Sequence, residues 1–433
     1  FNSKKLLFIV HRENIARKAL NSFKRVFGNS RSYGIYSGNK KEENSDFIFS
    51  TVQTLSRTER LRTFDKDHFD YIIVDESHRA AASSYEVFLD YFRPKFLLGM
   101  TATPERTDGK DIFEKFDHNV GYEIRLQQAL EEDILCPFHY FGVADIEVDD
   151  ELLTDHADFN KLTSEERVSR IIEKAQFYGC QNNDVRGLVF CSRIEEAKEL
   201  STLFNKHGYR TVALSGETEE SERELCIQRL ESNDASVKLD YIFTVDIFNE
   251  GVDIPSVNQI IMLRPTQSAI IFVQQLGRGL RKLEDSEKFL TVIDFIGNYQ
   301  NNYLIPIALF GDKSFNKDQI RRLMVDENEC IPGSSTVSFD RIAKERIFNS
   351  INTANTSATR DLKLDYLSLK HRLGKGPMMM DFWKHGARDP KAFIDNKKSY
   401  YNFKVHCDPD SAKTIGEDHK LLLEFYSVHV LNA

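Results

Sequence analysis

The amino-acid sequence predicts an α/β fold in which two tandem parallel-sheet domains are followed by a mainly helical C-terminal domain. Short apolar runs rich in β-branched residues recur between residues 5 and 293, as in strands that are buried on both faces of a parallel sheet. Stretches with apolar residues at helical spacing separate these runs, as expected for βαβ units. The strand signal fades after Gly311, and 433 residues are too many for one core, which indicates about three domains.

The first series of strands is assigned to residues 1–136. Residues 5–10 form its first predicted strand, and a helix follows because Ile15, Ala19 and Phe23 recur at helical spacing. Gly28 is the expected end of this helix, since glycine is common just after a helix C-terminus. Further strands are predicted at residues 47–49, 71–74 and 96–100. Their alternation with helical stretches predicts a parallel sheet covered by helices.

A second series of strands is assigned to residues 161–312, after a connector at residues 137–160. The connector is placed there because the periodicity weakens and acidic residues such as Asp145 accumulate. A helix around residues 168–175 opens the second series, and another is expected around residues 197–204. Strands are predicted at residues 187–190, 211–214, 241–245, 259–263 and 289–293.

The C-terminal domain is assigned to residues 313–433. Helical patterns at residues 339–351, 361–373 and from residue 378 on predict a mainly helical region, which we expect to be incomplete at residue 433. One interpretation is a helix-turn-helix that docks its second helix on DNA. The other is a small helical domain packed by aromatic and methionine residues, and the composition favours this second interpretation.

Composition and charge limit the class of protein. With 41% hydrophobic and 29% charged residues, and no apolar run of ~18 residues, the sequence predicts a soluble protein without a membrane span. The net charge of −9 excludes a wholly basic nucleic-acid binder but leaves room for a local basic channel. Six widely spaced cysteines without a Cys-x-x-Cys pair argue against disulfides or a zinc site, and favour a reducing compartment, which we take to be the cytoplasm.

Two adjacent carboxylates, Asp75 and Glu76, follow the predicted strand at residues 71–74. In open α/β sheets, ligands bind beyond the carboxyl ends of the strands. An acid pair at such a place suits a magnesium-nucleotide site, where one carboxylate holds the metal and the other activates water. Taken alone, the pair fits equally well an acidic turn that caps the next segment.

Polar stretches also follow the other predicted strands, and their order carries more information than any one of them. They are Val10-His11-Arg12, Ser50-Thr51-Val52-Gln53, Thr101-Ala102-Thr103, Cys191-Ser192-Arg193, Thr244-Val245-Asp246, Glu250-Gly251-Val252-Asp253-Ile254-Pro255, and the pattern Gln274-x-x-Gly277-Arg278-x-x-Arg281. Together with the acid pair, this series resembles the superfamily-two helicases and translocases of the DExH type, a DEAD/DEAH-like group that includes restriction-type members. The resemblance covers about the first 300 residues and implies two RecA-like domains.

The resemblance implies ATP and Mg²⁺ as cofactors. Asp75 is expected to hold Mg²⁺ through water, and Glu76 to orient or deprotonate the attacking water. The family pattern implies that His78 makes contact with Gln274 and with the hydroxyls of Thr101 and Thr103.

The second domain is expected to supply further nucleotide contacts. Asp253 matches the acid that contacts the nucleotide in the family, and Gly251 allows a close backbone approach. Arg278 and Arg281 are three residues apart, on one face if that segment is helical. They suit γ-phosphate contact as arginine fingers, which are worth about 10³–10⁵ in rate. The two glycines beside them lower helix propensity, which a purely structural helix would have little reason to accept.

A further set of residues is assigned to nucleic acid by the resemblance. Hydroxyl groups, arginines and backbone amides at strand ends suit phosphate oxygens and carry little sequence information. The assigned residues are Arg12, Thr51, Gln53, Ser192, Arg193 and Thr244. The acid box, the Thr-Ala-Thr motif and the segment at residues 250–255 are most similar to DNA-translocating members, so DNA is favoured over RNA as the partner.

One element of the family pattern is missing from the sequence. A motor of this type needs Gly-x-x-x-x-Gly-Lys-Ser/Thr to cradle the phosphates of ATP, and no stretch of the 433 residues supplies it. The simplest expectation is a fragment of a longer helicase or translocase, cut inside its first domain and poor at binding ATP by itself. The alternative is a non-hydrolysing nucleic-acid-binding module that has lost this loop.

Overall fold

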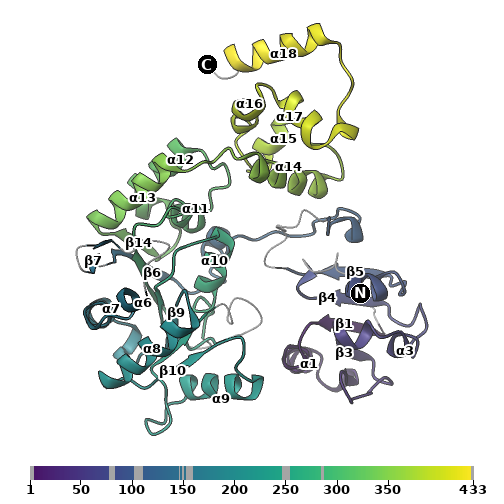
Figure 1. Ribbon diagram of the computed structural model, residues 1–433. Coiled ribbons are helices and arrows are strands. Elements are labelled where there is room, and N and C mark those ends of the chain that lie inside the picture. Colours follow the sequence, from purple (N-terminus) through teal and green to yellow (C-terminus); the bar gives the residue numbers. More distant parts are fainter. Residues whose placement is uncertain are drawn as a thin grey trace. The chain divides into compact units, whose positions relative to one another are not determined.

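Two parallel sheets organise the chain in the computed structural model (Figure 1). The structure describes residues 4–77, 83–101, 111–145, 147–148, 151–152, 159–245, 254–283 and 287–430. The chain divides into two units: unit 1 comprises Phe1–Tyr122 and Ser357–Ala433, and unit 2 comprises Glu123–Thr356.

Unit 1 is built on a five-stranded sheet in the order β2-β3-β1-β4-β5, in which every pair is parallel. Its strands are β1 (Leu6–Val10), β2 (Tyr33–Tyr36), β3 (Phe47–Thr51), β4 (Tyr71–Val74) and β5 (Phe96–Gly99). Since all strands run the same way, the turns that follow them leave from one edge of the sheet.

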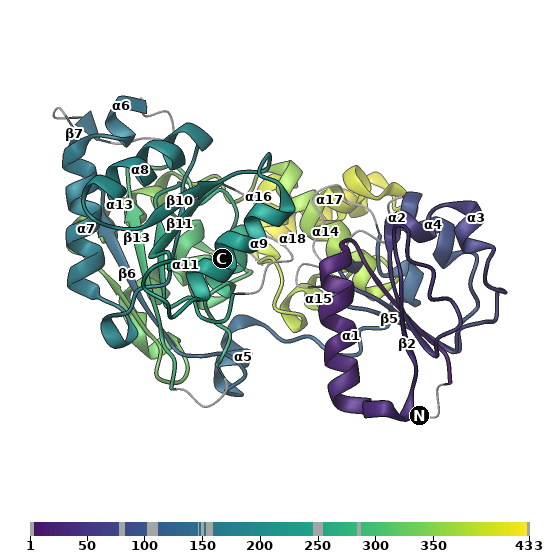
Figure 2. The ribbon, with the colours of Figure 1, turned by 90° about the horizontal axis from the view of Figure 1, so that it is seen from below.

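Helices cover both faces of this sheet. Helix α1 (Glu13–Phe27) packs on β1, β2 and β3, where Ala16 joins a core with the even-numbered residues of β1 (Figure 2). The opposite core is formed by the odd-numbered residues of β1 with α2, α3 and α4. These three helices are α2 (Val52–Leu55), α3 (Thr58–Leu61) and α4 (Ser83–Leu89). All five residues of β1 are therefore buried, as its apolar run predicts.

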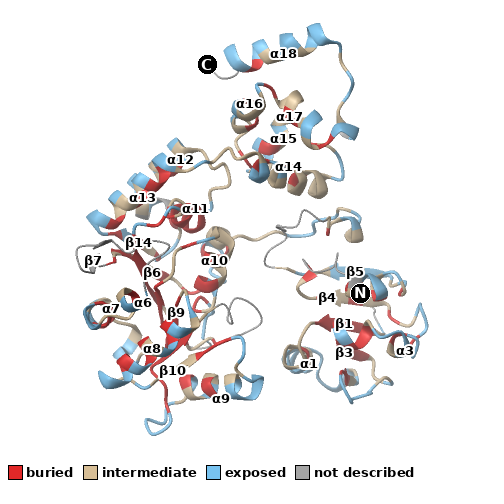
Figure 3. Ribbon diagram, in the orientation of Figure 1, coloured by how far each residue is buried: buried red, intermediate tan, exposed pale blue. Residues whose placement is uncertain are grey.

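Strand β4 is less covered than its sequence predicts. Ile72 and Val74 are buried, but Tyr71 and Ile73 are only partly buried (Figure 3). The reason is that α1 lies over β1, β2 and β3, and its cover ends before β4.

Unit 2 is built on a seven-stranded parallel sheet in the order β10-β11-β9-β12-β13-β6-β14. Its strands are β6 (Phe138–Ala144), β9 (Gly187–Phe190), β10 (Thr211–Leu214), β11 (Tyr241–Thr244), β12 (Gln259–Met262), β13 (Leu290–Ile296) and β14 (Thr336–Phe339). A separate short antiparallel pair consists of β7 (Glu147–Val148) and β8 (Glu151–Leu152).

Helices also cover both faces of the second sheet. On one face lie α7 (Glu165–Tyr178) and α8 (Ile194–Lys206). The helices that pack on the other face are α9 (Glu220–Glu231), α10 (Ala269–Gly277), α11 (Leu304–Phe310), α12 (Lys317–Asp326) and α13 (Arg341–Thr353). Two short helices, α5 (Leu126–Glu131) and α6 (Phe159–Leu162), complete this unit.

The C-terminal helices form a small core of their own within unit 1. They are α14 (Thr359–Leu373), α15 (Met379–Lys384), α16 (Lys391–Lys397), α17 (Tyr400–Cys407) and α18 (Glu417–His429). Tyr366, Phe382, Phe393 and Phe403 fill much of this core, as the interpretation of a small helical domain predicts, but the expected packing by methionines is wrong for Met378 and Met380, which are exposed. The ring of His118 contacts the backbone carbonyl of His371, which joins this domain to the segment that follows β5.

The predicted fold class is confirmed: two parallel-sheet domains with helices on both faces, and a helical C-terminal part. The boundaries, however, lie elsewhere than the sequence indicated. The expected connector at residues 137–160 contains β6, which pairs with β13 and β14 inside the second sheet. The expected C-terminal domain at residues 313–433 is divided, since α12, β14 and α13 belong to unit 2. Within the part of the chain that the structure describes, we find no helix with the length and apolar character that crossing a membrane requires.

Candidate nucleotide and strand-binding sites

The polar residues singled out in the first half of the sequence gather at one edge of the first sheet. Register places Val10 beside Thr51, Ile9 beside Val74, and Val74 beside Gly99. The residues that follow these strands, Arg12, Asp75 and Thr101 among them, therefore leave the sheet side by side at its carboxyl edge. This is the edge at which open α/β sheets bind ligands.

The acid pair is held by the backbone of its neighbours. The Asp75 amide donates to the carbonyl oxygen of Ile9 at 2.9 Å, and the Ser77 amide donates to that of Met100 at 2.9 Å. Between them, the Glu76 amide donates to Oδ1 of Asp75 at 3.0 Å. Glu76 itself has a φ of 52°, in the left-handed region, which is sparsely populated by residues other than glycine. Such conformations cost about 1–3 kcal/mol and cluster at functional sites.

Close packing next to the acid pair explains why residue 99 is a glycine. A Cβ at Gly99 would lie 2.5 Å from Cζ of Phe116 and 2.9 Å from Oγ of Ser77. Gly99 thus allows β5 to pack against both side chains, and Ser77 is buried beneath the turn. The turn that carries Asp75 and Glu76 is fixed on both sides by these contacts.

The acid pair fits magnesium only as part of a larger set of ligands. Among the described residues, no group of three or more His, Cys, Asp or Glu side chains is placed to hold a metal ion. Mg²⁺ in nucleotide sites is commonly held by one or two carboxylates together with water and the substrate phosphates. Asp75, which is partly exposed at the sheet edge, is compatible with that mode.

The strand-binding residues expected in unit 1 have different environments. Arg12 is the N-cap residue of the 15-residue helix α1 and is partly exposed. Gln53 is exposed on α2. Thr51, by contrast, is buried, and its hydroxyl lies 2.9 Å from that of Thr54 and 3.3 Å from that of Ser37. This buried hydroxyl cluster gives Thr51 a structural role in the conformation observed.

In unit 2, Arg193 occupies a position equivalent to that of Arg12 in unit 1, at the start of the helix that follows a strand. Phe190 ends β9, and Arg193 is the exposed N-cap residue of the 13-residue helix α8 that follows. Ser192 is partly exposed, and its amide donates to Oε2 of Glu196 at 2.9 Å. Thr244, at the end of the neighbouring strand β11, is completely buried, and its hydroxyl has no hydrogen-bond partner among the described residues.

A buried ionic network beneath Ser192 was not expected from the sequence. Arg167 of α7 is fully buried, and its guanidinium binds the Asp145 carboxylate through two hydrogen bonds of 3.2 and 2.8 Å. The same guanidinium donates to Oε1 of Glu196 at 3.0 Å and to the carbonyl oxygen of Leu162 at 2.9 Å. Glu196 therefore links this network to the backbone of Ser192. Asp145, interpreted above as part of an acidic connector, is one of its buried members.

The two arginines of the last motif are not on one helical face. Helix α10 ends at Gly277 with Arg278 as its C-cap residue, and the exposed Arg281 pairs with Leu135 in an isolated antiparallel bridge. The segment from Arg278 to Arg281 is therefore not a continuation of the helix, and the two arginines do not share a helical face as expected. The glycines also have different roles than expected: a Cβ at Gly279 would lie 2.4 Å from Leu290, so Gly279 has a packing reason. Gln274 is partly exposed on α10.

Four of the expected site residues lie outside the described residues. They are His78, Thr103, Gly251 and Asp253. Thr101 is described and lies partly buried, two residues beyond the end of β5.

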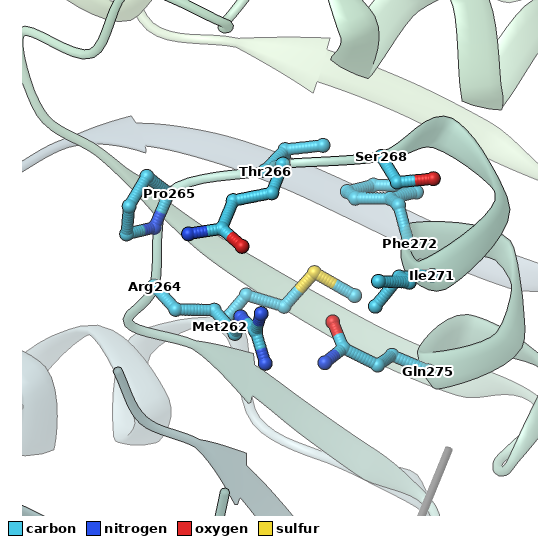
Figure 4. A pocket seen from close by; sticks show the side chains of 9 residues that line it. Met262, Arg264, Pro265, Thr266, Ser268, Ile271, Phe272 and Gln275 are labelled. Carbon is cyan, nitrogen blue, oxygen red and sulfur yellow. The ribbon is translucent and has the colours of Figure 1, made fainter. Parts of the chain in front are cut away.

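A second feature of unit 2 that the sequence did not indicate is a pocket beside the N-terminus of α10 (Figure 4). Arg264 and Gln275 are among its lining residues. The family pattern assigns a role to the neighbouring Gln274, and the sequence does not show which of the two adjacent glutamines lines a pocket. The pair Arg264-Pro265, directly after a predicted strand, was the available clue.

Three protein families match the chain in succession. The family described as type III restriction enzyme, res subunit, matches residues 1–106, and the helicase conserved C-terminal domain matches residues 166–282. A domain of unknown function, DUF8090, matches residues 362–433.

Individual relatives support the same assignment. The chain is 30% identical over 326 residues to the putative ATP-dependent helicase IRC3 of Saccharomyces cerevisiae, an alignment that covers 72% of this chain and 46% of the relative. It is 25% identical to the type I restriction enzyme EcoAI endonuclease subunit of Escherichia coli, covering 68% of this chain and 40% of the relative. The chain thus spans about half the length, or less, of these curated relatives.

A solved structure agrees with the fold. The ATP-dependent type ISP restriction-modification enzyme LlaBIII bound to DNA matches with a TM-score of 0.53 at 17% identity, over 99% of this chain and 34% of that one. At this identity the likeness concerns the fold alone. Taken with the family matches and the order of the motifs, these findings show that the chain belongs to the superfamily-two helicases and translocases of the DExH type.

Proposed function

We propose that this protein is an ATP-dependent translocase or helicase that acts on DNA. The observation that carries the proposal is the repeated placement of polar motifs at the carboxyl edges of two parallel sheets. In each unit, an arginine occupies the N-cap position of the helix that follows an inner strand, without a capping hydrogen bond from its side chain: Arg12 after β1 and Arg193 after β9. A motor that steps along a strand needs such a pair of matching phosphate contacts, one in each moving half.

The chemistry of the first unit supports hydrolysis of a nucleotide. Asp75 is proposed to hold Mg²⁺ and Glu76 to act as the base that takes a proton from the attacking water. Arg278 and Arg281 of the second unit are proposed to stabilise charge on the transferred phosphoryl group, and Thr101 to link the state of the nucleotide to the strand. Bound ATP with Mg²⁺ would supply the free energy for each step.

The nucleic-acid contacts proposed are those that remain exposed at the two edges. Arg12, Gln53, Ser192 and Arg193 can reach phosphate oxygens, whereas the buried Thr51 and Thr244 are proposed to support the turns beside them. Contacts of this kind position a strand without reading its bases. DNA is preferred to RNA because a restriction enzyme family matches residues 1–106 and a restriction enzyme relative matches 68% of the chain.

Hydrolysis measured on the full-length natural protein tests the proposal. We expect single-stranded DNA to raise the ATPase rate more than an RNA of the same sequence does. Glu76→Gln should keep nucleotide binding and abolish this stimulation, because the amide cannot accept the proton from water. The control is Glu86→Gln, the same change at an exposed position on α4.

Each other outcome identifies a different function. If RNA stimulates hydrolysis and DNA does not, the nucleic-acid partner is RNA. Salt-dependent DNA binding with no hydrolysis by the wild-type protein would support the alternative, a non-hydrolysing nucleic-acid-binding module. Hydrolysis by Glu76→Gln at the wild-type rate would remove Glu76 from its proposed role.

A further inference from the structure

The pocket beside α10 is a small depression that is partly open to solvent. It lies where β12 ends and α10 begins. The lining residues are Met262, Arg264, Pro265, Thr266, Gln267, Ser268, Ile271, Phe272 and Gln275.

The charge of the lining favours an anion. Of these nine described residues, one is a cation, Arg264, and none is a carboxylate. The N-terminus of the nine-residue helix α10 contributes to the same lining, with Ser268 as its N-cap residue, and the Ser268 hydroxyl accepts from the Ile270 amide at 3.2 Å. The first N–H groups of a helix have no intrahelical partner and carry a partial positive charge.

A buried amide provides the independent sign of a ligand. Gln275 is only 3% exposed, and its Nε2 has no hydrogen-bond partner among the described residues. Figure 4 shows its amide turned into the space between Met262 and Arg264. A buried donor without an acceptor costs about 1–3 kcal/mol, so an oxygen atom bound in the pocket would remove this cost.

The pocket lies next to the strand-binding turn of the same unit. Met262 pairs with Phe190, and the Leu263 amide donates to the Phe190 carbonyl oxygen at 2.9 Å. Arg264 therefore leaves the sheet beside Ser192, on the neighbouring strand. Burial raises the pKa of the Cys191 thiol well above its usual range, and the positive charge of Arg264 acts on the same thiol in the opposite direction.

We propose that this pocket binds one backbone phosphate of the strand that Ser192 and Arg193 contact. Arg264 supplies the charge, the Gln275 amide supplies a hydrogen bond, and the partial positive charge at the N-terminus of α10 adds to the attraction. This inference rests on the proposed function, since it adds a phosphate site to the same track. It also makes Arg264 and Gln275 strand-binding residues, which the motif pattern does not include.

The test measures DNA binding by the 433-residue chain as a function of salt. Fluorescence anisotropy with a labelled single-stranded oligonucleotide gives the slope of log K against log salt. Each phosphate contact to a single strand contributes about 0.7 to this slope. We expect Arg264→Gln to lower the magnitude of this slope by about 0.7. When salt is raised from 50 to 200 mM, the variant should therefore lose less affinity than the wild type, by a factor of about 2 to 3.

Matched variants separate this site from general charge effects. Arg341→Gln removes the same charge from α13, where the side chain is 84% exposed, and should leave the slope unchanged. Gln275→Glu keeps the size of the side chain but places a negative charge in the pocket, and should weaken binding at least as much as Arg264→Gln. Thermal melting of each variant verifies that the fold is kept, and Arg264→Gln, at the partly exposed residue, remains informative if Gln275→Glu does not fold.

The outcomes distinguish this inference from the proposed function. If Arg193→Gln lowers the slope and Arg264→Gln behaves like Arg341→Gln, the pocket proposal is overturned and the proposed function stands. If the wild-type chain shows no salt-dependent binding to DNA or RNA, both fall. A third arm uses inorganic phosphate as the ligand in thermal unfolding. If phosphate stabilises the wild type but not Arg264→Gln, and the DNA slopes of the two are equal, the pocket binds a free anion and the proposal is contradicted.

Discussion

Replacement of Arg167 by methionine tests the buried ionic network beneath the turn that carries Ser192 and Arg193 in unit 2. Arg167 is the shared partner of two buried carboxylates, Asp145 and Glu196, with exposed side-chain fractions of 0, 1 and 0%. Methionine fills much of the space but leaves both carboxylates without their cation. Glu196 also accepts from the Ser192 amide, so the change reaches the turn that carries Arg193.

The expected magnitude follows from the burial of the charges. Removal of one partner from a buried ion pair costs about 3–5 kcal/mol, because an uncompensated charge remains inside the protein. For a unit of this size, 1 kcal/mol corresponds to about 2–4 °C in melting temperature, so unit 2 should melt about 6–20 °C lower. Arg170→Met on the same helix removes a partly exposed pair with Glu173 and should cost no more than about 0.5 kcal/mol.

Differential scanning calorimetry, which resolves the two units if they melt separately, measures both variants. The triple variant Arg167→Met, Asp145→Asn, Glu196→Gln removes all three charges and should recover a large part of the lost stability. If Arg167→Met and Arg170→Met melt together, or if the triple variant is less stable than Arg167→Met alone, the reasoning about buried charge is refuted.

Further predictions concern close packing and a buried acid. Gly279→Ala should destabilise unit 2 by about 1–3 kcal/mol, because the added Cβ would lie 2.4 Å from Leu290. Gly277→Ala is the control, since a Cβ there would have nothing within 4 Å, and it should be neutral or slightly stabilising. Equal effects of the two changes in urea unfolding would contradict this. Burial raises the pKa of Asp294 to about 7, although the hydrogen bond from Tyr140 acts in the opposite direction and the charge of Asp145 adds to the rise. The folded state then holds more protons than the unfolded state between pH of about 4 and 7, so its stability falls as pH rises through this window, by at most about 1.4 kcal/mol per pH unit. Asp294→Asn keeps the partner of Tyr140 and should flatten this part of the stability profile, measured by urea unfolding from pH 5 to 8; an unchanged slope would show that other groups cause it.

Most strands could be predicted from the sequence because their apolar runs are buried on both faces. Strand β6 is different, since Phe138–Ala144 includes His139 and Gly142 and reads as an interrupted pattern. Gly142 is there for packing: a Cβ would lie 2.3 Å from Phe339 of β14. Strand β14 itself has four residues and follows a turn-rich stretch, so its place in the sheet depends on partners far away in the chain.

The motifs located the turns, but not the environment of each side chain. Thr51 and Thr244 were assigned to nucleic acid by resemblance to the family motifs, and both are buried. The role of Asp145 depends on Arg167, 22 residues away, and a run of acids at the surface has the same sequence pattern. Hydrogen-bond partners and burial arise from tertiary packing, which is why the buried network and the pocket at Gln275 were found only in the structure.

Movement along DNA is the central claim, and an ATP-dependent displacement assay on the full-length natural protein tests it most directly. The measured quantity is the rate at which streptavidin is removed from the end of a biotin-labelled single-stranded DNA, with ATP and with a non-hydrolysable analogue. We predict displacement with ATP, none with the analogue, and none by Glu76→Gln. Displacement by Glu76→Gln at the wild-type rate, or ATP hydrolysis by the wild type without displacement from DNA, would contradict the account.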